Sequence, residues 1–489
     1  MAPWVLQKIY EELSLRAIAE APVDVRVLYM QRLVRFAAYG LTTLVLALFL
    51  RNLGTTEERI GLFMTLTLVG DVAISLVLTI IADGVGRRRM LAFGAVSMAC
   101  SGVVFALTSN YWVLLAAAVF GVISPSGNEI GPFRAIEEST LAHLVTKEDR
   151  TSILAWYTMC GFIGTSLGIV TCGWVVRALQ LKLGWTPLES YRVVFYTYAV
   201  LGLIKFILCL VLSDRCEPEK KAEQVSSSAD SDSERRPLLT QDPINATKDP
   251  VSRSSKTSKL RSILPELSSE SASLVWKLCL LFALDSLGSG LSPASWLTYF
   301  FNQKFHLSEG KLGSVFFIAS ICSAISNLFA ASLAKRLGLI KTMVFTHVPA
   351  SIALSLIPIP ENAGIAIALL AFRASTNSMD QAPRQAFLAA AVLPGERTAV
   401  MGVVNVVKTM SQSIGPVLTG LLASRSLFWV AFVVAGALKL LYDFLILAMF
   451  LGYKTVEERA EHNVDVSVVA VEEEAANGAV ESEGRPTGR

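Results

Sequence analysis

Long apolar segments separated by short polar ones run through most of the 489-residue chain. A helix needs about 20 apolar residues to cross the hydrocarbon core of a bilayer. Twelve segments come close to that length. They lie at residues 32–50, 60–82, 90–108, 112–133, 152–176 and 191–212, and at 274–300, 311–334, 342–358, 364–382, 399–422 and 428–450. The pattern predicts an all-α membrane protein with twelve transmembrane helices.

A polar stretch, residues 213–273, separates the first six segments from the last six. It contains 15 serines, ten Lys or Arg and eleven Asp or Glu. Such a composition buries too little apolar surface to offset the entropy of ordering, so we expect a disordered linker. The expected organisation is an N-terminal segment (1–31), a six-helix bundle (32–212), the linker (213–273), a second six-helix bundle (274–452) and a disordered acidic tail (453–489).

The orientation follows from the Lys and Arg residues in the short loops, which concentrate on the cytosolic side of membrane proteins. If both termini are cytosolic, the inner loops carry eleven of these residues and the outer loops seven. We therefore expect a multi-pass protein whose two termini, linker and tail face the cytosol.

The two halves of the chain resemble each other in sequence. Four pairs of short motifs recur in the same order, including the glycines of the fifth and eleventh segments and a Gly–Lys pair in the sixth and twelfth. These matches are Gly168 and Gly173 with Gly415 and Gly420, and Gly202 and Lys205 with Gly436 and Lys439. Parallel repeats of six helices are typical of transporters, and they predict two pseudo-symmetric bundles.

Composition narrows the function further. Hydrophobic residues make up 53% of the chain and charged residues 17%, against about 25% charged in soluble domains, and the mean hydropathy is +0.52. A net charge of +3 argues against a nucleic-acid partner. The seven cysteines and four histidines form no metal-binding spacing, and no phosphate-binding loop occurs. We therefore expect no metal, no cofactor and no enzymatic activity.

The loop after the second segment reads Asp83-Gly84-Val85-Gly86-Arg87-Arg88. It resembles the loop signature of the major facilitator superfamily, and within that family the chain is similar to fungal multidrug proton antiporters. The resemblance implies a transporter without a cofactor, working as a monomer by alternating access. It also implies a conformational gate at Asp83, Gly86, Arg87 and Arg88. Near the inner end of the tenth segment, Asp380 and Arg384 have the i, i+4 spacing of an ion pair and are assigned to the same gate.

Charged side chains within the apolar segments are the candidates for chemistry, because an isolated charge at that depth costs at least about 2.5 kcal/mol. Arg373 keeps its charge and could attract an anionic group or pair with Asp285. The candidates for a substrate or proton pathway are Asp71, Asp285, Arg373, Glu129 and Lys408.

Other polar residues of the segments are expected to be structural. Lys439 and Asp443 have the spacing of a local ion pair on a peripheral helix. Arg32 and Arg35 are interpreted as anchors at the inner face. No histidine is assigned a role as a ligand.

The linker contains Glu234-Arg235-Arg236-Pro237-Leu238-Leu239, which fits an acidic dileucine sorting signal. In proteins with this pattern, clathrin adaptors bind Leu238 and Leu239 in a pocket and the acid, here Glu234, at a basic site. The signal favours a vacuolar or lysosome-like membrane over the plasma membrane.

Together these patterns predict a secondary active transporter of a small solute, coupled to protons and directed towards export or vacuolar sequestration. Proton-coupled uptake of a metabolite and a non-transporting receptor with the same fold are the alternatives. A receptor would bind its ligand without flux and would need the linker for function.

Overall fold

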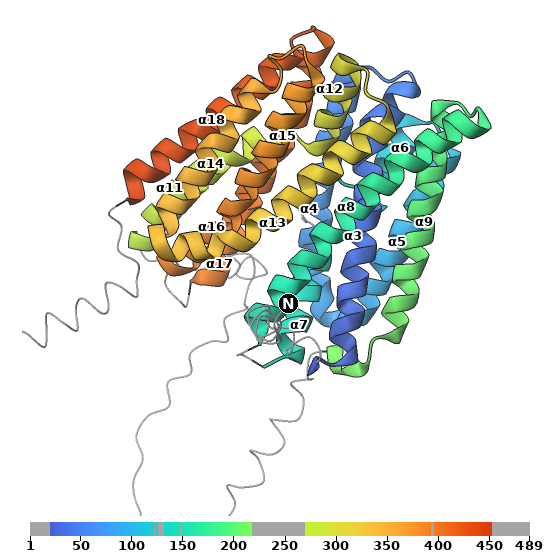
Figure 1. The fold of residues 1–489 in the computed structure, drawn as a ribbon. Helices are drawn as coiled ribbons and strands as arrows, with labels where there is room; N and C mark the ends of the chain where they lie inside the picture. The colour runs from blue at the N-terminus through green and yellow to red at the C-terminus, as the bar shows by residue number, and fades with distance from the viewer. Residues whose placement is uncertain are drawn as a thin grey trace, which may run out of the picture.

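Helices make up almost all of the chain that the computed structural model describes, and they form two bundles lying side by side (Figure 1). The described residues are 20–121, 123–125, 132–146, 149–217, 269–392 and 396–451. The expected disordered tail, most of the expected linker and the dileucine signal lie outside these ranges. Residues 213–217 and 269–273, which were expected to belong to the linker, are described and include a short helix and the start of the seventh span.

Each bundle contains six spans, some of which consist of two consecutive helices. The first bundle contains α3 (Val23–Asn52), α4 (Glu57–Val85), α5 (Arg87–Leu107), α6 (Tyr111–Gly121) with α7 (Pro132–Leu144), α8 (Arg150–Leu183) and α9 (Pro187–Val211), followed by η1 (Asp214–Cys216). The second contains α11 (Ser269–Leu291) with α12 (Ala294–Phe305), α13 (Glu309–Leu337), α14 (Leu339–Leu356), α15 (Ala363–Asn377) with η2 (Ser378–Asp380) and α16 (Gln381–Ala391), α17 (Arg397–Ser424) and α18 (Phe428–Phe450).

The structure differs from the expected spans in two ways. The first helix begins at Val23 rather than at residue 32, so Arg32 and Arg35 lie well inside it. Three expected single helices are divided into two. Between α11 and α12, Pro293 removes a backbone donor and disfavours helical geometry at the residue before it, which explains the break.

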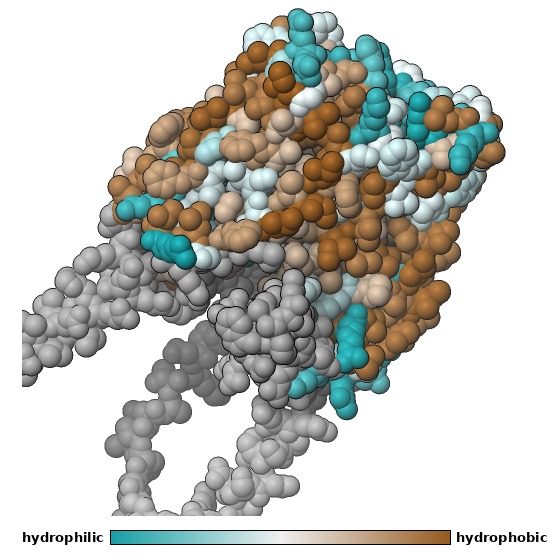
Figure 2. All heavy atoms as spheres, in the orientation of Figure 1, coloured by the Kyte–Doolittle hydropathy of each residue, from teal (hydrophilic) through white to brown (hydrophobic). Residues whose placement is uncertain are grey.

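Apolar side chains cover the outer faces of the bundles. Trp276, Phe120 and Phe345 are each more than 60% exposed on the helices that bear them. Figure 2 shows that hydrophobic residues dominate the visible flank and that hydrophilic ones gather towards the ends of the helices. Within the described residues, eight helices are long and apolar enough to cross a membrane. An exposed apolar surface of this extent fits a multi-pass membrane protein.

The two bundles repeat the same packing scheme. In the first, α3 packs against α8 and α5 against α9; in the second, α11 packs against α17 and α14 against α18. Between the bundles, α4 contacts α17, α8 contacts α13 and α3 contacts α12. In the first of these contacts, the second span of the first bundle meets the fifth span of the second bundle. In the second contact, the fifth span of the first bundle meets the second span of the second bundle. This exchange is expected for two bundles related by a pseudo-twofold axis.

The bundles touch most closely at one end of the molecule, which we call the loop end. It is the end where α3 leads into α4 and α12 leads into α13. At the contact of α4 with α17, a Cβ atom on Gly61 would lie 2.4 Å from the backbone oxygen of Pro416. At the contact of α8 with α13, a Cβ atom on Gly173 would lie 2.5 Å from the backbone oxygen of Glu309. Only glycine allows such an approach, so these two crossings close the loop end.

Hydrogen bonds between the bundles reinforce the closed loop end. The Tyr299 hydroxyl donates to Glu57 Oε1 over 2.9 Å, and the Tyr191 hydroxyl donates to Glu309 Oε1 over 2.7 Å. Deeper in the interface, the hydroxyl oxygens of Thr43 and Ser295 lie 3.3 Å apart. The described structure is therefore a conformation in which the loop end is sealed.

The Thr43–Ser295 contact predicts a disulfide in a double cysteine variant. In a background without the seven native cysteines, Thr43→Cys/Ser295→Cys is expected to crosslink the two halves under mild oxidation, because the two hydroxyl oxygens already lie 3.3 Å apart. A protease site placed in residues 218–268 allows the measurement. After cleavage, the halves should migrate together on a non-reducing gel and separately after reduction.

The matched control is Thr43→Cys/Ser351→Cys, in which the second cysteine replaces a buried serine of α14, a helix that packs against α15 and α18 of the second bundle. This pair should stay uncrosslinked. Crosslinking of both pairs alike, or of neither, would contradict the described contact.

Candidate functional site

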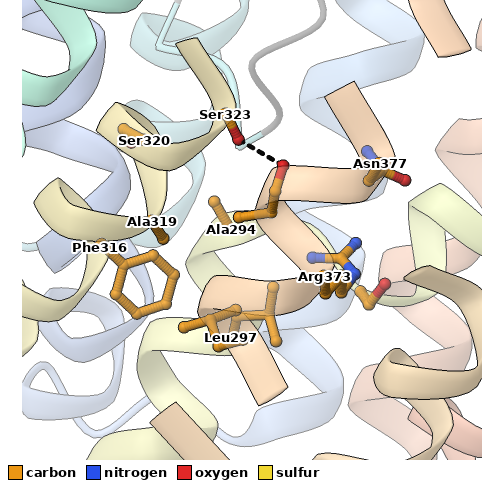
Figure 3. A pocket seen from close by; sticks show the side chains of 11 residues that line it. Ala294, Leu297, Phe316, Ala319, Ser320, Ser323, Arg373 and Asn377 are labelled. Carbon is orange, nitrogen blue, oxygen red and sulfur yellow. Dashed lines mark hydrogen bonds between the residues drawn. The ribbon is translucent and has the colours of Figure 1, made fainter. Parts of the chain in front are cut away.

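A cavity of about 250 Å³ lies in the second bundle where α15 faces α13 and the break between α11 and α12. Eleven residues line it: Ser292, Ala294, Leu297, Phe316, Ala319, Ser320, Ser323, Leu370, Arg373, Ala374 and Asn377. The break positions two of them, because the chain leaves its helical path at Ser292 and resumes it at Ala294. Figure 3 shows Arg373 and Asn377 on the same helix, with Phe316 and Leu297 across the cavity.

Arg373 is the charged residue of this cavity. Within the described residues, no acidic side chain lies within 4 Å of its guanidinium, so the expected pair with Asp285 does not form. The neighbouring Ser323 hydroxyl donates to the backbone oxygen of Ala374 over 2.7 Å, which fixes α13 against α15 beside the cavity (Figure 3). The guanidinium is therefore held at membrane depth with its donors available.

Asp71 occupies the position of the first bundle that is equivalent to Ser323, a lining residue of the cavity. It follows Gly61 by ten residues, as Ser323 follows Gly313, and Gly61 and Gly313 hold equivalent places in the two glycine crossings. Asp71 is only 4% exposed, and the Ser124 hydroxyl hydrogen-bonds to its carboxyl. In the part of the chain that the structure describes, no Lys or Arg nitrogen lies within 4 Å of this carboxyl. The first bundle thus places the acid Asp71 at this depth, and the second bundle places Arg373 beside the equivalent serine.

Asp285 lies in a buried charge cluster instead. Its carboxyl accepts from Arg384 Nη1 over 2.6 Å and from Lys439 Nζ over 2.7 Å. Arg384 also forms an ion pair with Asp380, one helical turn earlier, as the spacing predicted. The predicted local pair of Lys439 with Asp443 is wrong, because the lysine reaches across to α11. Two bases around one carboxylate stabilise its ionised form.

The first bundle contains an equivalent cluster with the signs of two positions exchanged. Glu137 on α7 forms ion pairs with Arg35 on α3 and Lys205 on α9, at 2.7 and 2.9 Å. Arg35 precedes Gly40 by five residues, as Asp285 precedes Gly290, and both glycines pack against the backbone of the bundle's fifth span. The central acid and its basic partner have therefore changed places between the halves, while the lysine is kept.

His347 joins the cluster of the second bundle. It is 1% exposed, and its Nδ1 lies 2.8 Å from Asp443 while its Nε2 lies 3.6 Å from Asp285. His347 was assigned no role as a ligand, and the structure places it among the charged side chains of this cluster.

The residues assigned to a gate lie in two different places. The backbone amides of Arg87 and Arg88 donate to the two oxygens of Glu217, at 2.7 and 3.1 Å, and the Arg88 side chain forms an ion pair with Asp214. Gly86 has a φ of 98°, which favours glycine and begins α5 at this point. The segment after α9 thus caps the N-terminus of α5. Asp380 and Arg384 belong to the buried cluster.

One predicted residue lies beside the second cluster, and the side chains of five others are not described. Lys408 lies with its Nζ 5.8 Å from the centre of the Phe282 ring, close to the second cluster. Glu129 falls outside the described residues, as do Glu234, Leu238 and Leu239. The side chain of Asp83 is also not described. The proposed gate and pathway roles of all these residues stay predictions.

Sequence reasoning missed Glu137 because the fourth span was expected to end at residue 133. Helix α7 instead continues to Leu144, which places Glu137 inside the bundle with no exposed surface. Arg32 was interpreted as an inner-face anchor, but it is 5% exposed and its guanidinium lies 3.9 Å from the centre of the Tyr157 ring. In both cases the available signal was a charged residue with apolar residues four positions before and after it, which places it on the apolar face of its helix.

The first cluster predicts unequal losses of stability. Glu137→Gln removes the one acid between Arg35 and Lys205, and leaving buried charges unpaired costs about 3–5 kcal/mol. Lys205→Met leaves the Glu137–Arg35 pair intact, so its loss should be less than half as large. Thermal unfolding of the purified protein in detergent, followed by tryptophan fluorescence, measures both.

The control is Glu361→Gln, which neutralises an exposed loop carboxylate and should unfold like the wild type. A loss for Lys205→Met as large as that for Glu137→Gln would show that the cluster is not organised around the glutamate.

Comparison with known proteins places the chain in one family. The model of the Major Facilitator Superfamily matches residues 28–292 and again residues 278–474. The two matches correspond to the two bundles. The fold is similar to the solved structure of a D-xylose–proton symporter, with a TM-score of 0.65, 12% identity, and coverage of 86% of this chain and 96% of that one.

Two relatives are informative in sequence. A Saccharomyces cerevisiae protein described as "Uncharacterized membrane protein YJR124C" is 38% identical over 437 residues, which cover 88% of this chain and 94% of the relative. The quinolone resistance protein NorA of Staphylococcus aureus is 26% identical over 187 residues, which cover 38% of this chain and 44% of NorA.

Proposed function

The chain belongs to the major facilitator superfamily and is therefore a membrane transporter rather than an enzyme, and we propose that it moves a small solute by alternating access with proton coupling. The solute binds in the cavity around Arg373, and the two bundles rock about it. The observation that carries the proposal is that a buried acid, Asp71, stands in the first bundle at the position equivalent to Ser323, which lines this cavity in the second.

Asp71 is the proposed proton carrier. A carboxyl group at membrane depth without a basic partner is buried at low cost only in its neutral form. Asp285 lies between Arg384 and Lys439, and both stabilise its negative charge. Of the predicted acids that the structure describes, Asp71 is therefore the one that can gain and lose a proton as its surroundings change between conformations.

The direction of transport is proposed to be export or vacuolar sequestration. The partial similarity to a quinolone resistance protein supports outward movement from the cytosol. The excess of basic residues in the inner loops supports cytosolic termini. The dileucine sequence of the linker supports delivery by clathrin adaptors to a vacuolar or lysosome-like membrane. The proposed working state is a monomer.

Transport can be tested with a mixture of candidate solutes. Purified protein in proteoliposomes with an acidic lumen is given a low-molecular-mass ultrafiltrate of yeast extract, and mass spectrometry identifies the solutes that accumulate. We expect at least one solute to accumulate only while the proton gradient lasts. Asp71→Asn should reduce this gradient-driven accumulation at least about tenfold, because it removes the proton site.

Two controls make the result specific. Glu361→Gln should transport like the wild type, and oxidised Thr43→Cys/Ser295→Cys should be inactive until it is reduced, because its loop end cannot open. Failure of any solute to move, with or without a gradient and with correctly folded protein, would contradict the proposal. Accumulation that is insensitive to the gradient would contradict the proposed proton coupling but not the proposed transport.

A further inference from the structure

Given the transport function proposed above, we propose that the cavity around Arg373 binds the carboxylate of a small organic monoanion, and that the apolar body of this acid lies against Phe316 and Leu297. The proposal goes beyond transport of an unspecified solute because it names a substrate class. It rests on the charge, the hydrogen-bonding groups and the size of the cavity.

The charge of the cavity comes from Arg373. A guanidinium presents five donors in a planar fork that fits a carboxylate, and it does not lose its proton. The clusters show what an arginine of this fold does when an acid is near: Arg35 forms an ion pair with Glu137, and Arg384 forms ion pairs with Asp285 and Asp380. Within the described residues, no acid of the protein balances Arg373 in this way. An anion brought by the ligand would do so.

The number of charges limits the ligand to a monoanion. Arg373 is the one charged residue among the eleven that line the cavity. The polar residues beside it are neutral, and Ser292, Ser320 and Asn377 supply hydroxyl and amide groups. A second negative charge on the ligand would have to be buried without a counter-charge, which is costly.

The remaining wall selects an apolar body. Leu297, Phe316 and Leu370 are less than 10% exposed, and Ala294, Ala319 and Ala374 add small apolar surfaces. A sugar would leave many hydroxyl groups without partners against such a wall. The volume of about 250 Å³ lies just below the range of about 300–1,000 Å³ that is usual for ligand pockets. The cavity therefore fits a short aliphatic or single-ring acid.

Binding of matched acids and amides tests this proposal. Purified full-length protein is heated in detergent with benzoate, hexanoate or indole-3-acetate, and separately with benzamide, hexanamide or indole-3-acetamide. At least one acid should raise the unfolding temperature in a concentration-dependent way, while its amide should not. Arg373→Gln should weaken the binding of that acid at least about tenfold, because the charge-assisted hydrogen bonds are lost.

Three further variants separate binding from folding. Arg373→Lys keeps the charge without the fork and should bind more weakly than the wild type but better than Arg373→Gln. Ser320→Leu should obstruct the cavity and weaken binding while Arg373 is intact. Arg425→Gln, an exposed arginine at the end of α17, should bind like the wild type. Without ligand, Arg373→Gln should unfold at or above the wild-type temperature, because no protein partner is lost.

The proposal is overturned if none of the three acids stabilises the wild type, or if Arg373→Gln is stabilised equally. Binding without transport would leave the ligand class standing and contradict the proposed function. Gradient-driven transport of a neutral or cationic solute, with no response to the acids, would support the proposed function and contradict the ligand class.

Discussion

The cost of placing a charge inside a membrane governs the arrangement of this molecule. An ionised side chain at that depth needs an opposite charge, hydrogen-bonding partners or access to a water-filled space. Most of the buried charges described above meet the first condition. Glu137 and Asp285 are each held by two bases, and each connects three helices of its bundle. Among the described residues, Asp71 and Arg373 have no opposite charge within ion-pair distance, which is why the proposed functional region is centred on them.

The two clusters also make each bundle a rigid unit. In the first, the ion pairs tie α3, α7 and α9 together; in the second, they tie α11, α16 and α18 together. The exchange of acid and base between the halves preserves the attraction, because only the relative sign of the two partners matters. The ion pairs are thus pseudo-symmetric between the bundles, although the residue types at two of the positions are not. Rigid bundles are what rocking about a central site requires.

The sequence predicted the spans, the repeat and the family because these depend on local hydrophobicity and on the order of short motifs. It placed Asp285 and Arg373 at membrane depth, but it paired Asp285 with the wrong arginine. Periodicity along one helix does not show which neighbouring helix a side chain faces. Glu137 was missed because the fourth span was expected to end at residue 133, four residues before it. Lys205 and Lys439 were recognised as equivalent, but they were interpreted as peripheral, because their partners come from helices far away in the sequence.

The paired glycines at the loop end restrict how the halves can move while that end is sealed. Gly61 with Gly420, and Gly173 with Gly313, bring backbone against backbone at two separate places. A rigid body held at two points keeps a single freedom, which is rotation about the line that joins them. Sliding and twisting would break one contact or the other, whereas tilting about this line widens or narrows the opposite end and preserves both. These four glycines thus form a hinge between the bundles. The positions where a hydrogen atom replaces a side chain set the axis of that hinge.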